Sequence, residues 1–210
     1  MTSSAPVNYA KTYFIHPTLT PIRGEPEYPT LRVLKNELKA NASRVTSDLG
    51  GGAHGHLGLV LTPAEYAMIS AIPYIRPLHP GNLNIPAGTT NHEANRLTLA
   101  HTEAIRVFRE TVEVEKALLN QTCAALDDTY YKERISPHTN TVIEPLSTFL
   151  TWLFTTYGDI DREAIKTEEK KVLEITYDLQ DPMTNIFEPI QELEQLAIAG
   201  KKTLFSRTTR

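Results

Sequence analysis

The sequence predicts an all-α protein, a multi-helix bundle with one long central helix. Apolar residues recur at three- and four-residue spacing over most of the chain, and serine, threonine or aspartate precedes several of these runs. Glycine follows other runs, as it does at many helix ends. The 210 residues include 40% hydrophobic and 22% charged residues, a composition typical of a globular protein with a sizeable core.

The first 33 residues are predicted to form a proline-rich extended arm. Its prolines are Pro6, Pro17, Pro21, Pro26 and Pro29. Proline at this density prevents a regular helix. The aromatic residues Tyr9, Tyr13 and Phe14 lie between them, and we expect these side chains to contact another surface, such as a neighbouring subunit. A flexible lead-in without such contacts is the alternative.

Residues 34–200 are predicted to form the helical domain. A short helix is expected over residues 31–45, and a second begins at the capping box of Thr62 and Glu65. The apolar residues of the second run from Tyr66 to Ile72. Between them, the glycine-rich residues 49–61 predict a loop or a small hairpin. Residues 73–88 are rich in proline and glycine and predict a long surface loop.

The longest helix is predicted to begin at Thr90, with Glu93 three residues later, and to run to about Leu126. Unbroken, it would span about 50 Å and form the spine of the domain. Because β-branched residues cluster near Thr111, two shorter helices are the alternative.

Three more amphipathic helices are predicted within residues 141–200. The first begins at Thr141, in a capping box with Glu144, or at Glu144 itself, which would put Pro145 one residue into the helix, and it ends at Gly158. The second is capped by Asp159 or Asp161. The third starts at Asp181, with a kink or a break expected at Pro189. Residues 201–210 are a basic polar tail, interpreted as a solvated end or as a linker to a missing C-terminal region.

The glycine-rich residues 50–58 suggest a phosphate-binding loop and a metal site, but a purely structural role is favoured over both. Gly50, Gly51, Gly52, Gly55 and Gly58 resemble a phosphate-binding loop, but no Lys followed by Ser or Thr comes after the last glycine. A structural turn explains them better. His54 and His56 would share one face of a strand and could bind a metal ion with further ligands, although a hydrogen-bonded pair is the commoner outcome.

Charge and cysteine content disfavour several classes of protein. The net charge is −4, which argues against nucleic acid as the main partner. Cys123 is the only cysteine, so internal disulfides and a thiolate zinc site are excluded, in agreement with a reducing compartment. No apolar run approaches the roughly 20 residues of a membrane span, and we expect a cytoplasmic protein without a membrane partner.

Two strings carry a resemblance to a known family. One is LSTFLTWLFTTYGDIDREAIKTEEKKVLEITYDLQDPMTNIFEPIQELEQLA and the other is GGGAHGHLGLVLTPAEY. The first resembles the helical Gag region of copia-type long-terminal-repeat retrotransposons, and the second is similar to a segment of such elements in algae and oomycetes. The likeness covers residues 34–200 and implies a capsid protein of a virus-like particle. The zinc knuckle of the family is absent, so any RNA binding would belong to a region beyond Arg210.

The function expected from the sequence is therefore structural self-association, with no enzyme activity, no cofactor and no catalytic residue. The residues predicted to form subunit contacts are Tyr9, Tyr13, Phe14, Pro77, Pro80 and Trp152. Two alternatives stay open. One is a metal- or ligand-binding enzyme centred on residues 50–58 with His54 and His56, and the other is a helical adaptor that binds a partner helix beside Trp152.

Overall fold

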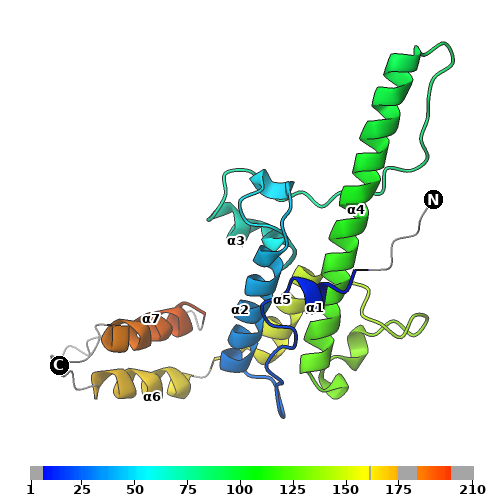
Figure 1. Cartoon of the computed structure of the whole chain (residues 1–210). Coiled ribbons are helices and arrows are strands. Elements are labelled where there is room, and N and C mark those ends of the chain that lie inside the picture. Colours follow the sequence, from blue (N-terminus) through cyan, green and yellow to red (C-terminus); the bar gives the residue numbers. More distant parts are fainter. Residues whose placement is uncertain (1–6, 161, 175–183, 200–210) are drawn as a thin grey trace. The chain divides into compact units, whose positions relative to one another are not determined.

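The computed structural model describes residues 7–160, 162–174 and 184–199, and these form helices joined by turns and loops (Figure 1). No β-strand occurs among the described residues; the one β-type pairing there is an isolated bridge between Ile135 and Val142. The chain divides into two compact units, residues 1–153 and residues 154–210. The all-α fold class with one long helix is confirmed.

The first unit contains most of the helices. They are α1 (Tyr9–Thr12), α2 (Tyr28–Arg44), α3 (Pro63–Ala67), α4 (Asn91–Ala125) and the start of α5 (Leu146–Tyr157). Single 3₁₀ turns lie between them: η1 (Leu49–Gly51), η2 (Leu57–Leu59), η3 (Asp128–Tyr130) and η4 (Lys132–Arg134). The core gathers the buried side chains of α2, of the second half of α4 and of α5.

Helix α4 is continuous over its 35 residues, so the alternative of two helices is wrong. The side chain of Thr90 accepts a hydrogen bond from the backbone N–H of Glu93 and caps the first turn. At Thr111 the hydroxyl donates to the carbonyl of Val107 at 2.8 Å, a bond within the helix that accommodates this β-branched residue. The helix therefore has no break where β-branched residues cluster.

The N-terminal segment packs on its own chain instead of forming a separate extended arm. It contains the helical turn α1, and Tyr9 and Phe14 are buried. The side chain of Asn41 accepts a hydrogen bond from the amide of His16 at 2.8 Å and donates to its carbonyl, also at 2.8 Å. The Ile22 amide donates to the carbonyl of Ala125 at 2.8 Å. A boundary at residue 33 is therefore not seen, because residues 9–22 belong to the core of the first unit.

Other predicted helices form with changed limits. Thr62 and Glu65 make a reciprocal capping box, but α3 ends at Ala67 instead of continuing to Ile72. Helix α5 begins at Leu146, directly after Pro145, so the observed start is closer to the predicted alternative at Glu144 than to Thr141, and the helix ends before Gly158 as expected.

The second unit contains the end of α5, α6 (Arg162–Leu173) and α7 (Thr184–Ala199). Helices α6 and α7 contact each other. Ile165, Leu193 and Ala197 are buried in it. Pro189 lies inside α7, which is assigned as one helix, so no break occurs there. The predicted cap residues Asp161, Asp181 and Pro182, and the tail 201–210, lie outside the described residues.

Candidate functional site

The glycine-rich string folds as two 3₁₀ turns, η1 and η2, and the hairpin alternative is not formed. Gly55 has a φ of +53°, and a β-carbon built there would lie 2.3 Å from the carbonyl oxygen of Val45. At Gly58 the same atom would overlap the ring of Tyr74. Glycine is therefore required for left-handed backbone and for close packing, as the structural interpretation predicts.

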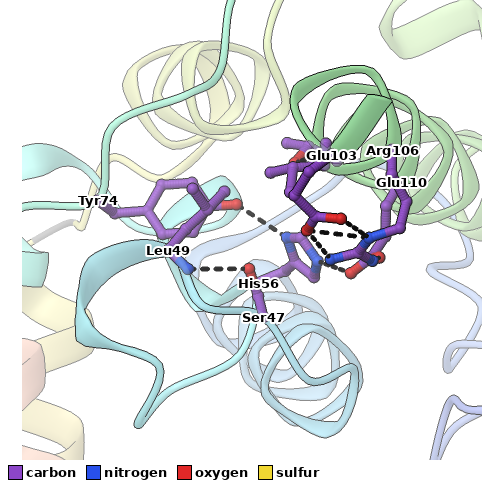
Figure 2. Close-up of polar contacts among 9 residues, drawn as sticks. Ser47, Leu49, His56, Tyr74, Glu103, Arg106 and Glu110 are labelled. Carbon is purple, nitrogen blue, oxygen red and sulfur yellow. Dashed lines mark hydrogen bonds and ion pairs between the residues drawn. The ribbon is translucent and has the colours of Figure 1, made fainter. Parts of the chain in front are cut away.

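His56 is the centre of a buried polar cluster (Figure 2). Only 1% of its surface is exposed. Its Nδ1 lies 2.9 Å from the hydroxyl of Tyr74, and its Nε2 lies 3.3 Å from Oε1 of Glu110. Because an ionised carboxylate only accepts, Nε2 carries the proton, and Nδ1 accepts from the Tyr74 hydroxyl. The cluster joins the glycine-rich loop, the 73–88 loop and α4.

Burial sets the protonation of this cluster. It lowers the pKa of His56, and the hydrogen bond that His56 donates to Glu110 opposes this shift only in part. Burial also raises the pKa of the Tyr74 hydroxyl. His56 is thus neutral at neutral pH, and Tyr74 is protonated, which is the pair of states that the hydrogen bonds require.

The cluster reaches solvent through an ion-pair network on α4. Arg106 bonds Glu110 at 2.7 Å and Glu103 at 2.7 Å, and Figure 2 shows the three side chains beside the imidazole. A hollow of about 140 Å³ lies next to Glu110 and is lined by Thr46, Ser47, Asp48, Arg106 and Val107 as well. His56 itself is closed off from solvent. A substrate could not reach the buried imidazole. The hydrogen bonds of His56 therefore fit a structural link between chain segments better than a proton-transfer site.

His54 does not join His56. Its Nε2 lies 3.2 Å from the carbonyl oxygen of Ile69, whereas the partners of His56 are Tyr74 and Glu110. The expectation that both rings share one face of a strand is wrong, because Gly55 between them has left-handed backbone and no strand forms. Over the described residues, no three His, Cys, Asp or Glu side chains are grouped so as to hold a metal ion.

A second polar group, Glu115, was not anticipated from the sequence. Its carboxylate pairs with Arg76 and accepts from the Leu146 amide at 3.1 Å. Burial raises its pKa, and these two partners counteract the rise. A signal did exist, since Glu115 occupies a position on the buried stripe of α4 between Thr111 and Leu118. A carboxylate on such a stripe needs a partner brought from elsewhere in the fold.

The predicted contact residues have different environments. Tyr9 and Phe14 are buried within the chain, so they are not available to a neighbouring subunit, whereas Tyr13 is exposed. Pro77 and Pro80 are half-buried. Trp152 is also half-buried: it stacks on Phe149 with 5.8 Å between ring centroids, and the guanidinium of Arg134 lies 4.6 Å from its ring.

The first half of α4 is much less covered than its second half. No residue between 91 and 110 is buried, whereas seven residues from Thr111 to Ala125 are. The apolar spacing nevertheless continues into this half through Leu97, Ala100, Ala104, Val107 and Phe108. Leu99 is 72% exposed, and Leu83 and Ile85 of the preceding loop are exposed as well. In Figure 1 this half of α4 projects beyond α2 and α3.

Comparison with protein-family models, with curated proteins and with solved structures finds no match for this chain. None of the described helices combines the length and the apolar character that crossing a bilayer requires. The fold and the site thus define an all-α protein in which the polar clusters around His56 and Glu115 link distant segments of the same chain.

Proposed function

We propose that this protein is a structural protein that self-associates, in the manner of a Gag-like shell protein of a copia-type retrotransposon. The observation that carries the proposal is the projecting half of α4, residues 91–110, which has an apolar stripe and no buried residue. The resemblance of residues 34–200 to such Gag regions agrees with it.

The energetics of an isolated helix support a partner for this surface. Most of the stability of helices in proteins comes from the packing of an apolar face. In residues 91–110 the ion pairs Glu93–Arg96 and Glu103–Arg106 are exposed and contribute little. Packing against a second surface would supply the missing stabilisation.

The size and charge of the projection suit a second copy of the chain. A helical segment of 20 residues is about 30 Å long and offers roughly 500 Å² on one side. With the neighbouring apolar side chains Leu83 and Ile85, it approaches the roughly 800 Å² per partner of a standard interface. Its charges are Glu93, Arg96, Glu103, Arg106, Arg109 and Glu110, three of each sign, so two copies can meet without net repulsion.

The test is light scattering on the purified protein over a wide range of concentration and salt, with negative-stain microscopy of the same samples. We expect oligomers or particles whose apparent Kd rises by about tenfold or more for Leu97→Asp, which places a charge on the apolar stripe. Asn95→Asp is the matched control, because it adds the same charge at an exposed position two residues from Leu97, on the other side of α4 from the stripe. It should change association little.

Two results would overturn the proposal. One is a wild-type protein that stays monomeric at every concentration and salt, with no particles. The other is an equal loss of association in Leu97→Asp and Asn95→Asp, which would assign the effect to net charge instead of the apolar surface.

A further inference from the structure

A small apolar pocket lies between the turn η2, helix α3 and residues 70–74. Its volume is about 120 Å³. Its lining includes the buried residues Leu61 and Tyr66 and the exposed residues Ala67 and Ala71, so the pocket reaches solvent. All of the lining belongs to the described residues 58–74, and none of the lining residues is charged.

The hydroxyl groups of this lining are already hydrogen-bonded within the chain. Those of Tyr66 and Ser70 each donate to the carbonyl of Gly50 at 3.2 Å. The hydroxyl of Tyr74 lies 2.9 Å from Nδ1 of His56. A polar occupant would lose its hydrogen bonds to water and find few new ones, so an apolar side chain is favoured.

The volume of the pocket suits one branched aliphatic side chain. An apolar cavity of about 150 Å³ holds benzene, and a leucine side chain is smaller than benzene. Leu78 is 88% exposed, the highest value for a large apolar side chain among the described residues. Leu78 therefore does not fill the pocket of its own chain and is available to a second one.

The loop segment that carries Leu78 is anchored on both sides of it. Arg76 pairs with Glu115 of α4. The ring of His79 meets Phe108 edge-on, with 5.0 Å between centroids. Because the segment is already ordered, less ordering entropy is lost when Leu78 enters a partner.

Other exposed apolar side chains accompany Leu78 and the pocket. Between residues 68 and 78 they are Met68, Ile69, Ile72 and Ile75. With Leu78, their exposed parts total roughly 500 Å², more than half of the roughly 800 Å² that each partner buries in a standard interface. The only charged side chain between residues 66 and 92 is Arg76, which is paired with Glu115, so two copies of this surface can meet without charge repulsion.

We propose that Leu78 of one copy of the chain inserts into the pocket lined by Ala67 and Ala71 of a second copy. This inference rests on the proposed self-association and adds a second contact to that of residues 91–110. Every copy carries both the inserted side chain and the pocket, so the contact either closes as a reciprocal dimer or continues from copy to copy. Together with the α4 contact, it lets an assembly grow beyond a dimer.

The experiment uses the whole chain carrying Leu97→Asp, which weakens the α4 contact, and measures the remaining association by analytical ultracentrifugation. Adding Leu78→Asp, which replaces the inserted side chain, or Ala71→Trp, which fills the pocket, should raise the remaining Kd about tenfold or more. Ile143→Asp and Ala53→Trp are the matched controls, because Ile143 is 72% exposed, Ala53 is exposed, and neither lines the pocket. They should leave the Kd unchanged. Far-ultraviolet circular dichroism checks that each variant is folded.

A mixture of the two variants tests the insertion directly. The Leu78→Asp chain keeps an open pocket and the Ala71→Trp chain keeps its Leu78, so the mixture should form heterodimers with a Kd at least tenfold below that of either variant alone. The proposal is overturned if mixing gives no such gain, which would assign the pocket to another occupant such as a small apolar molecule. It is also overturned if the controls weaken association as much as Leu78→Asp and Ala71→Trp do.

Failure of this contact is distinguishable from failure of the α4 contact. If Leu97→Asp leaves association unchanged while Leu78→Asp weakens it, the α4 contact alone is wrong. If Leu97→Asp abolishes association and the mixture forms no heterodimer, the contact of Leu78 with the pocket alone is wrong.

Discussion

Gly55→Ala should destabilise the first unit strongly. Gly55 has a φ of +53°, in the left-handed region that costs an L-residue about 1 kcal/mol or more. The new β-carbon would also lie 2.3 Å from the carbonyl oxygen of Val45 and 2.7 Å from that of Ser43. Both are backbone atoms at the end of α2, so no side-chain rotation relieves the overlap.

Moving the loop away from α2 would break buried hydrogen bonds. The backbone N–H of His56 donates to the carbonyl of Ala42 at 3.0 Å, and the His56 ring is fixed by Tyr74 and Glu110. An unsatisfied buried donor costs about 1–3 kcal/mol. Together with the backbone strain, the expected loss is about 2–5 kcal/mol of unfolding free energy.

The assay is urea unfolding followed by the fluorescence of Trp152, the only tryptophan of the chain, which lies in the first unit. Gly24→Ala is the matched control. Gly24 has a φ of +83° but nothing within 4 Å of a β-carbon, so it should cost only the strain of about 1 kcal/mol. Equal losses in the two variants would refute the argument that close packing on α2 requires glycine at position 55.

Two further predictions concern the buried polar groups of the first unit. Acidification should destabilise the first unit. Burial lowers the pKa of His56 below 6.5, so the unfolded chain takes up the proton at a higher pH than the folded chain. Stability is therefore lost as the pH falls from about 6.5 toward the pKa of folded His56. The urea midpoint of His56→Gln should depend less on pH over this range, and an unchanged dependence would contradict the role of His56. Asn41→Ala should lower the unfolding free energy by about 2–3 kcal/mol, because it leaves the His16 amide and the side-chain oxygen of Gln121 without their partner. Hydrogen exchange should show faster exchange of the His16 amide, and retained protection there would argue against this anchor.

Local signals predicted most of the helices. The Thr62–Glu65 capping box and the Thr90 cap lie within one helical turn of the groups they satisfy, so spacing alone reveals them. Residues 49–61 were likewise predicted as a loop or hairpin, and the loop interpretation is the one observed. The predicted limits failed where burial decides them, as at Ile72, which is exposed beyond the end of α3.

The His56 cluster was beyond sequence reasoning. Tyr74 and Glu110 lie 18 and 54 residues from His56, and no periodic pattern links positions so far apart. For the same reason the pairing of Glu115 with Arg76 was missed. The burial of Tyr9 and Phe14 was missed because proline-rich segments have no periodic stripe that shows which side faces a core.

The sequence by itself determined the all-α class, the long helix and its cap, because these depend on side-chain spacing and hydrogen bonds within a few residues. Tertiary structure decided which apolar surfaces are used. It buries the second half of α4 and leaves residues 91–110 uncovered, although the same stripe runs through both. Burial is a property of what packs opposite a residue, and that neighbour is brought from a distant part of the chain.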